Sequence, residues 1–341
     1  MPPVALITGV TGQDGSYLAE FLLAKNYKVY GLSRYCSEEK QERLVNVKEH
    51  PSFFMLTGDL TDTARITDII RSLSNLGTCV EVYNLGAQSH VKLSFEQPEF
   101  TSNVDALGTL RILEAIRQTD GHFKFYQACT SEMFGKIQAP IQNEETPFYP
   151  RSPYGVSKVF GYWITKNYRE SYNLFACNGI LFNHESERRG LEFVTRKVTR
   201  GLAKWQKTRT PIILGNIDAK RDWGHAEDYI EAMWLMLQQE LPDDYVVGTG
   251  ETHTVREFIE EACQHIGTKI QWVGQGENEI GRDVITGDII IRISPEFYRP
   301  SEVDVLVGDA SKALRILGWS PRTSFQQLVQ RMMDSDKEAA A

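Results

Sequence analysis

The stretch Val4-Ala-Leu-Ile-Thr-Gly9-Val-Thr-Gly12-Gln-Asp-Gly15 decides the fold of this chain. A short apolar run is followed by three glycines in the spacing G-x-x-G-x-x-G and by an amphipathic segment that begins near Ser16. In such a strand–turn–helix unit the glycines permit a tight turn and let the backbone approach a pyrophosphate, while the helix N-terminus supplies N–H donors. The stretch therefore predicts a dinucleotide-binding unit, with a plain glycine turn as the alternative.

Short apolar runs alternate with amphipathic segments through the first half of the chain. The expected strands cover residues 4–8, 28–32, 53–57, 79–85, 123–129 and 175–181, and the expected helices cover 17–25, 63–73, 104–117 and 155–171. This alternation predicts an α/β fold with a doubly wound parallel sheet, the Rossmann fold, covered by helices on both faces.

The second half is less regular and lacks a linker that would separate it from the first. Helices are expected at 193–207, 227–239 and 255–266, and strands at 211–214 and 245–248. We expect a dinucleotide-binding domain over 1–180, to which about 211–250 return, and a smaller, partly interleaved C-terminal α/β substrate domain over 181–330. Residues 331–341 are expected to form a frayed tail.

Composition excludes several classes of protein. The 341 residues carry 37 Lys and Arg against 45 Asp and Glu, a net charge of −8, which argues against nucleic-acid binding. The five cysteines are scattered and the seven histidines show no metal-ligand spacing, so we expect free thiols, a cytoplasmic location and no metal. No stretch resembles a membrane span or a signal peptide.

The end of the second expected strand bears on the choice of cofactor. Arg34 lies 34 − 15 = 19 residues after Gly15, where an acidic residue would bind the ribose diol of NAD. A guanidinium there suits the 2′-phosphate of NADP, and a solvated surface arginine is the alternative. Asp59, after the third strand, lies where an aspartate can meet the adenine edge or cap a helix.

Tyr154 and Lys158 are spaced to share one face of a helix. A neighbouring ammonium favours the phenolate and lowers the tyrosine pKa from about 10. Lowering the tyrosine pKa to near 7 requires a shift of about three units, or roughly 4 kcal/mol, which Lys158 and a nicotinamide charge together could supply. The pair alone is common on helices, but with the glycine pattern it points to a site of the short-chain dehydrogenase/reductase type.

Two more polar groups follow the fifth expected strand. Thr130 can donate a hydrogen bond to a carbonyl or alkoxide oxygen, and Glu132 can accept or donate a proton. Ligands of open α/β sheets bind at the carboxyl ends of the strands, so both residues are candidates for the site. Ordinary turn polarity is the alternative.

The second half also carries a series of cations, as a nucleotide diphosphate requires. They are Arg188, Arg189, Arg196, Lys197, Arg200, Lys220, Arg221 and Arg299. Some of them are expected to be solvated surface residues.

Longer motifs resemble one family. They are TGVTGQDGSYLAE, YNLGAQSHV, YQACTSEMFG, TPFYPRSPYGVSK, FNHESERRG, FVTRKVTR, LGNIDAKRDWGHAEDY and FYRPSEVD. Over about residues 4–318 the chain resembles the GDP-mannose 4,6-dehydratases, which are extended short-chain dehydrogenases. In that family TSE with Y-x-x-x-K separates dehydratases from epimerases, and the NHES, RDWGHA and RPSEVD blocks separate enzymes of GDP sugars from those of dTDP-glucose.

The resemblance implies a role for each matching position. Thr130, Glu132, Tyr154 and Lys158 would be catalytic. The NADP contacts that it implies are Gly9, Val10, Thr11, Gly12, Gln13, Asp14, Asp59, Leu60, Leu85, Gly86, Ala87, Gln88, Ser89, Tyr154, Lys158, His184 and Arg189. Gly15 and Arg34 are also expected to contact NADP, on the basis of the glycine spacing and the arginine after the second strand. Expected nucleotide-sugar contacts are Ser89, Glu132, Asn183, Val194, Lys197, Arg221, Arg299 and Glu302.

The implied activity is dehydration of GDP-mannose to GDP-4-keto-6-deoxymannose through internal hydride transfer by NADP, in a homo-dimer or homo-tetramer. A 4,6-dehydratase of another GDP sugar, such as GDP-manno-heptose, is the nearest alternative. Glu132 argues against an epimerase or reductase, and the four catalytic positions argue against a silent NADP-binding regulator. One departure is Glu187, which stands where the family commonly has proline and is expected to add negative charge near the diphosphate.

Overall fold

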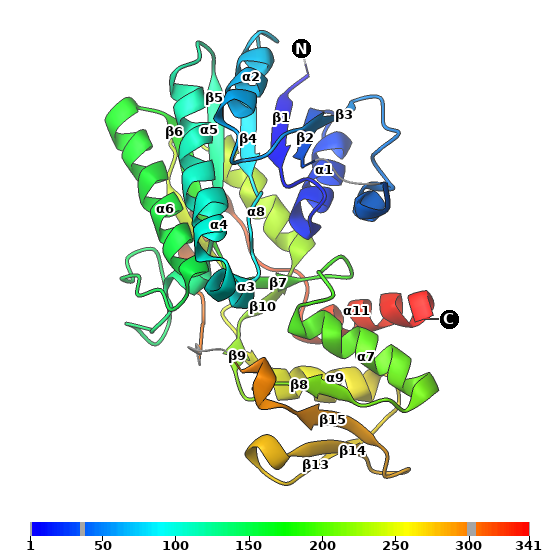
Figure 1. Cartoon of the computed structure of the whole chain (residues 1–341). Coiled ribbons are helices and arrows are strands. Elements are labelled where there is room, and N and C mark those ends of the chain that lie inside the picture. The colour runs from blue at the N-terminus through cyan, green and yellow to red at the C-terminus, as the bar shows by residue number, and fades with distance from the viewer. Residues whose placement is uncertain (1, 35–37, 299–304, 341) are drawn as a thin grey trace.

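The computed structural model describes residues 2–34, 38–298 and 305–340, and a seven-stranded parallel sheet is its largest feature (Figure 1). The strand order is β11-β6-β5-β4-β1-β2-β3, and every neighbouring pair is parallel. The strands are β1 (Val4–Thr8), β2 (Lys28–Ser33), β3 (Phe53–Thr57), β4 (Val80–Asn84), β5 (Phe123–Thr130), β6 (Phe175–Leu181) and β11 (Asp244–Val247). The predicted doubly wound sheet is confirmed.

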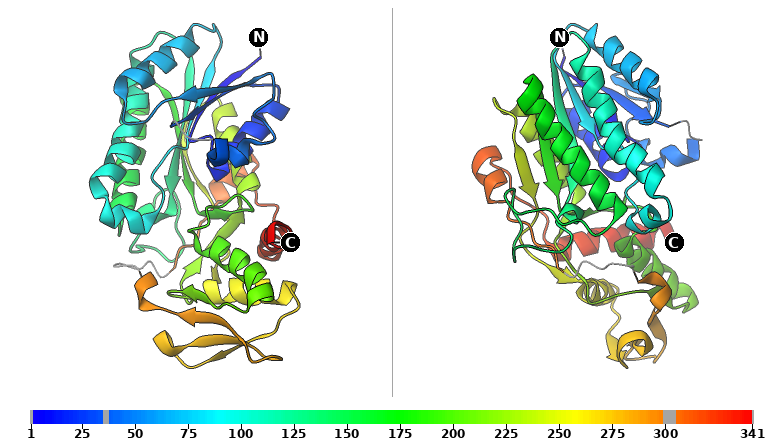
Figure 2. Two further views of the ribbon diagram at one scale, coloured as in Figure 1. Left: turned by 45° about the vertical axis from the view of Figure 1, so that its right-hand side comes forward. Right: turned by 60° about the vertical axis from the view of Figure 1, so that its left-hand side comes forward.

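The central strand β1 is buried on both faces because helices cover each side of the sheet (Figure 2). Ala5 and Ile7 belong to a core that includes residues of α1 (Gln13–Ala24) and α8 (Ala226–Gln238). Val4 and Leu6 belong to the opposite core, beneath α2 (Thr63–Ser74) and α5 (Gly108–Arg117). The long helix α6 (Pro153–Tyr172) packs beside α5.

The sheet reverses its winding direction at β1, since β2 lies on one side of that strand and β4 on the other. The loops that leave β1 and β4 at this point diverge and open a crevice, the usual ligand site of such sheets. Short elements continue from β4 and β5 around this crevice. They are α3 (Val91–Glu96), α4 (Pro98–Ser102), η2 (Asn103–Leu107) and η3 (Ser131–Met133), with η1 (Glu38–Leu44) after β2.

A smaller α/β domain lies below the large one in Figure 1. Its sheet has the order β13-β14-β15-β8, and three helices pack on it through a core that contains Trp205, Phe258 and Leu328. The elements are α7 (Val194–Thr208), β8 (Ile212–Leu214), α9 (Val255–His265), β13 (Ile270–Val273), η4 (Gly276–Asn278), β14 (Ile280–Asp283), β15 (Ile289–Ile293), η5 (Pro295–Phe297) and α11 (Phe325–Ala340).

Two short ribbons connect the domains. β7 (Asn183–Glu185) pairs with β10 (Trp223–His225), and β9 (Lys220–Arg221) pairs with β12 (His253–Thr254). The chain then returns to the large domain through α8 and β11. It returns there a second time through α10 (Ser311–Leu317), which packs on α8 and on β11. Residues 211–250 were expected to return to the large domain. The first part of this range does not, because β8 pairs with β15 in the sheet of the small domain.

The expected frayed tail is wrong for residues 331–340, the part of it that the structure describes. Helix α11 continues to Ala340, and Met332, Met333 and Asp336 on it are buried. Asp336 accepts hydrogen bonds from Arg196 and Thr199 of α7, so a buried ion pair holds the end of the chain. No helix in the described ranges is long and apolar enough to cross a membrane.

Candidate active site

A cavity of about 620 Å³ opens at the carboxyl ends of β1, β4, β5 and β6. Its walls come from the glycine turn, from the loops after β2, β3 and β4, from α6 and from the segment after β6. The segment that leads from the large domain into the small one therefore forms part of the wall of this cavity.

The glycine turn fits a phosphate group because its backbone leaves no room for side chains. Gly9 has a φ of +69°, and a Cβ on it would lie 2.8 Å from Cα of Gly86. A Cβ on Gly15 would lie 2.4 Å from the carbonyl oxygen of Gly9. The turn delivers the N-terminus of α1 to the cavity, where backbone N–H groups and the helix dipole favour an anion.

An ion pair neutralises the carboxylate that this turn carries. His184 Nε2 lies 2.8 Å from Asp14 Oδ2, and its Nδ1 lies 2.8 Å from the carbonyl oxygen of Phe182. Both ring nitrogens face acceptors, so the ring donates from both and is cationic. Burial alone would raise the pKa of Asp14, but the charge and hydrogen bond of His184 lower it to about 2. The positive charge of His184 therefore compensates the negative charge of Asp14, so that a phosphate bound at the turn is not repelled by an unpaired carboxylate.

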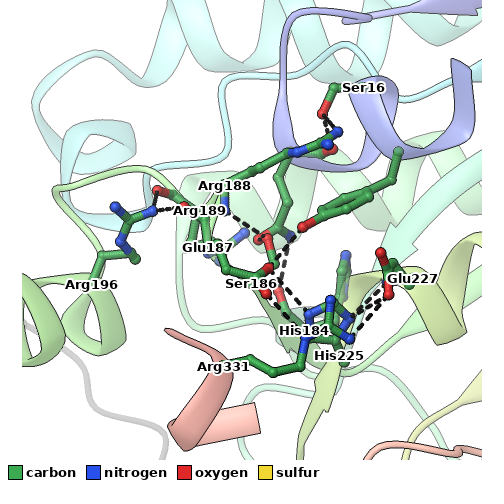
Figure 3. Close-up of polar contacts among 12 residues, drawn as sticks. Ser16, His184, Ser186, Glu187, Arg188, Arg189, Arg196, His225, Glu227 and Arg331 are labelled. Atoms are coloured by element: carbon green, nitrogen blue, oxygen red, sulfur yellow. Dashed lines mark hydrogen bonds and ion pairs between the residues drawn. The ribbon is translucent and has the colours of Figure 1, made fainter. Parts of the chain in front are cut away.

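The segment after β7 is bound to the glycine turn and to α1 (Figure 3). Gln13 donates to the carbonyl oxygen of His184 at 3.1 Å and accepts from Ser186 at 2.8 Å. Arg188 donates to Ser16 at 3.1 Å and to Glu20 at 2.7 Å. The segment after β7, the glycine turn and the start of α1 therefore form one hydrogen-bonded unit.

The predicted catalytic residues all line the cavity. Ser152 caps α6 and starts it with Tyr154 in its first turn. Thr130 ends β5 and accepts a hydrogen bond from the Glu132 amide at 3.2 Å. Lys158 is buried, donates to the carbonyl oxygen of Ala128 at 2.9 Å and lies 5.8 Å from the centre of the Tyr154 ring. A phenol, a hydroxyl and an ammonium thus converge where a carbonyl or alkoxide can be held.

Lys158 and a nicotinamide charge together are expected to lower the pKa of Tyr154, and the described residues alone do not lower it. Burial raises the pKa of Tyr154 above its ordinary value, and the negative charge of Asp105 raises it further, while a hydrogen bond with Thr130 lowers it. Lys158 directs its ammonium to a backbone carbonyl instead. The described residues alone therefore raise the pKa of Tyr154, and an added positive charge in the cavity would act in the opposite direction.

A family model described as GDP-mannose 4,6 dehydratase matches residues 6–332. The chain belongs to this family. It is 54% identical to GDP-mannose 4,6 dehydratase of Drosophila melanogaster, over 98% of this chain and 86% of the relative. The GDP-mannose 4,6 dehydratase of Homo sapiens is 52% identical, with 98% and 91% covered, and that of Vibrio cholerae 50% identical, with 100% and 95% covered.

Solved structures agree on the fold. UDP-glucose 4-epimerase of Thermus thermophilus, in complex with NAD, superimposes with a TM-score of 0.80 at 25% identity, over 98% of this chain and 99% of that one. The dTDP-glucose 4,6-dehydratase of Bacillus anthracis, also in complex with NAD, gives 0.79 at 21% identity, over 98% and 97%. This GDP-mannose dehydratase family member thus shares the architecture of epimerases and other dehydratases.

Most residues that the family resemblance assigns to cofactor face the cavity. All of the predicted cofactor contacts line it except Val10. Val10 is fully buried, and its side chain packs where a Cβ on Gly31 would lie. Any contact of Val10 with a ligand in the cavity would thus have to come from its backbone.

The predicted nucleotide-sugar contacts divide into three groups. Ser89, Glu132 and Asn183 line the cavity. Val194, Lys197 and Arg221 do not line it; Lys197 lies 4.9 Å from the Phe297 ring, and Arg221 is buried on β9. Arg299 and Glu302 fall outside the described residues.

Glu187 does not face the cavity, contrary to expectation. Its carboxylate accepts from Tyr17 at 2.8 Å and from Arg331 at 3.0 Å, and His225 Nε2 lies 3.4 Å away (Figure 3). It therefore joins α1, β10 and α11 and does not line the cavity. Arg196 of the cationic series likewise pairs with Asp336.

Sequence reasoning missed several residues around the site. His90, Glu192 and Phe193 line the cavity, and Arg189 stacks on Phe193 at 3.7 Å. Glu192 and Phe193 lie two and three residues after the FNHESERRG motif, which was a usable signal. Asp105, which acts on Tyr154, lies in a segment that the apolar pattern assigns to one regular helix, and its only sequence signal is a carboxylate amid apolar neighbours.

Proposed function

We propose that this chain is a GDP-mannose 4,6-dehydratase that forms GDP-4-keto-6-deoxymannose and water. The observation that carries the proposal is the convergence of Thr130, Glu132, Tyr154 and Lys158 on the cavity that also contains the glycine turn. Loss of water across C5 and C6 of a hexose needs an acidic C5 proton, which a ketone at C4 provides. The site therefore has to perform redox chemistry and acid–base chemistry on the same sugar.

A nicotinamide dinucleotide fits the cavity, because the glycine turn and the neutral Asp14–His184 pair accept a pyrophosphate. When bound, its ring supplies the acceptor and later the donor of one hydride, so cofactor is not consumed. Glycine-turn residues and Lys158 would hold it. We propose NADP over NAD because Arg34, at the carboxyl end of β2, is exposed on the cavity wall and can pair with a 2′-phosphate.

The protein side chains divide the proton transfers. Tyr154 takes the proton of the 4-hydroxyl as that carbon is oxidised, and Thr130 donates a hydrogen bond to the C4 oxygen. Glu132, at the start of η3, removes the C5 proton and returns it to the departing 6-hydroxyl as water forms. As C6 is reduced, C5 takes up one proton and Tyr154 gives up the one it accepted, so the starting protonation state is restored.

The geometry also bears on the assembly of the enzyme. Val156, Phe160 and Trp163 recur on one face of α6 and are exposed, Trp163 by 53%. A contiguous apolar helix face of this kind suits burial against a second copy, which supports the proposed homo-dimer or homo-tetramer. Sedimentation velocity of the purified chain tests this part: a monomer at micromolar concentration would contradict it.

Turnover of GDP-mannose tests the function. The enzyme with catalytic NADP should convert GDP-mannose to the 4-keto-6-deoxy product while total oxidised cofactor stays constant. GDP-manno-heptose, assayed in parallel, measures whether the site admits a larger group at C6. Binding of GDP-mannose without any product would contradict the proposal and favour a non-catalytic NADP-binding protein.

A further inference from the structure

Glu185 ends β7, where the chain leaves the large domain, and its side chain is only 3% exposed. Its backbone is fixed because β7 pairs with β10, with Glu185 opposite His225. A buried carboxylate is costly unless charged or polar groups compensate it. The proposed dehydration does not use this carboxylate, so its partners indicate what it does.

Two partners from the loop between β7 and α7 approach the same oxygen of Glu185. The hydroxyl of Thr195, in the first turn of α7, donates to Oε2 at 2.5 Å. Arg189 Nε lies 3.1 Å from the same oxygen, and the two side chains form an ion pair. Glu185 therefore closes this loop by contacts to residues four and ten positions further along the chain.

The ion pair places Arg189 on the wall of the active site. Arg189 lines the cavity, and its guanidinium carbon lies 3.7 Å from the centre of the Phe193 ring, which lines the cavity as well. Arg196 holds the backbone of the same residue by donating to the carbonyl oxygen of Arg189 at 3.2 Å (Figure 3). Among the described residues no acceptor takes a hydrogen bond from either Nη group of Arg189, which leaves two donors for an anion in the cavity.

The two contacts of this guanidinium have different effects. A guanidinium is a rigid planar fork, so the direction of its Nη groups follows from the plane of the fork and from its rotation within that plane. Stacking on Phe193 determines the plane. The carboxylate of Glu185 at Nε determines the rotation. Without the carboxylate the guanidinium could turn on the ring and direct its donors away from a ligand.

We propose that Glu185 is a positioning residue for the proposed dehydratase: anchored by Thr195, it orients Arg189 so that both Nη groups meet the anionic groups of the dinucleotide. Glu185 does not line the cavity, so it acts through Arg189 and not on the ligand itself. This inference rests on the proposed function, in which the cavity holds NADP.

A double-mutant cycle with Glu185→Gln tests the role. The amide keeps the size of the side chain and an oxygen acceptor for Thr195, but it removes the charge that holds Arg189. In calorimetric titration of nucleotide-free protein, NADP affinity should fall about tenfold, as for the loss of a charge-assisted contact. In an Arg189→Ala background the same substitution should change NADP affinity by less than about twofold, because the group that Glu185 positions is absent.

Asp244→Asn is the matched control. Asp244 pairs with Arg169 at 2.8 Å, and its side chain is 5% exposed, close to the 3% of Glu185. This pair belongs to the edge strand β11 and to α6, and neither residue lines the cavity. Its loss should lower the free energy of unfolding in urea and leave NADP affinity unchanged.

Thr195→Val is a milder variant that keeps both charges. It removes the hydroxyl that anchors Glu185, so NADP affinity should fall about two- to fivefold, and less in the Arg189→Ala background. This variant decides the question if Glu185→Gln does not fold.

The outcomes are separable. A chain that binds NADP without turnover of GDP-mannose would overturn the proposed function, and the cycle would still decide the role of Glu185; a chain that does not bind NADP would overturn both. Unchanged NADP affinity in Glu185→Gln would overturn the inference. Tighter binding would also overturn it, because Glu185 would then act only as a negative charge near an anion. So would an equal loss of affinity in the Arg189→Ala background or in Asp244→Asn.

Discussion

Asp14 and His184 form an ion pair of 2.8 Å that joins the glycine turn after β1 to strand β7. The two residues are 170 positions apart in the chain, so their pairing connects the cofactor side of the cavity to the segment that leads into the small domain. The folded-state pKa of Asp14, about 2, lies below the ordinary 3.8. Its contribution to stability is therefore fully present above pH 3.8 and is lost as the pH falls toward 2.

Asp14→Asn should lower the free energy of unfolding at pH 7 by about 2 kcal/mol, because the pKa shift and its linkage to folding are lost. Urea unfolding, followed by tryptophan fluorescence, measures the difference. Asp68→Asn on the exposed face of α2 is the control and should leave stability unchanged. Equal stability of Asp14→Asn and the parent would show that the pair contributes nothing.

Arg34→Ala should weaken NADP binding about ten- to hundred-fold, because a charge-assisted phosphate contact contributes about 1.5–3 kcal/mol. NAD has no 2′-phosphate, so its affinity should change little. Calorimetric titration of both cofactors provides the comparison. Equal losses for NADP and NAD would assign Arg34 a general role and remove the argument for NADP.

Tyr154→Phe should retain cofactor binding, since it removes a hydroxyl and little volume. Reduction of bound cofactor on mixing with GDP-mannose should slow by about 10² to 10⁴, the usual cost of losing a general base. Stopped-flow absorbance of the reduced nicotinamide measures this step. An unchanged rate would mean that another group accepts the proton of the 4-hydroxyl.

Glu187→Gln tests whether Glu187 stabilises the fold or shapes the substrate site. Loss of its charged hydrogen bonds to Tyr17 and Arg331 should lower the free energy of unfolding by about 1–3 kcal/mol and change KM for GDP-mannose by less than about twofold. Glu114→Gln, in an exposed pair with Arg117, should cost less than about 1 kcal/mol. A KM raised tenfold or more at unchanged stability would place Glu187 in the site after all.

Local pattern predicted the parts of the site that one strand and its following turn create. The glycines from Gly9 to Gly15 and the Tyr154–Lys158 pair lie where expected, because their spacing determines the turn and the helix face. Thr130 joins them since parallel strands bring their carboxyl ends to one edge. These placements depend on the local geometry of a turn, a helix face or a strand end, which the residue types and their spacing in the sequence determine.

Contacts between distant segments were not predictable in this way. Glu187 meets Tyr17 across 170 residues. Asp105 lies on a π-turn that interrupts what the apolar period predicts as one helix. In each case tertiary packing decides which way a side chain points, and a single sequence carries no direct signal of it.

Glu132→Gln tests the central claim most directly, because it should separate the two half-reactions. Oxidation at C4 needs Tyr154 and cofactor, whereas elimination needs a base for the C5 proton and an acid for the 6-hydroxyl, and an amide can serve as neither. Mixed with GDP-mannose, the variant should accumulate reduced nicotinamide absorbance, form product about 10² to 10⁴ more slowly, and return sugar without deuterium at C5 from deuterated water. Formation of 4-keto-6-deoxy product near the parent rate would contradict the account and reduce Glu132 to a turn residue.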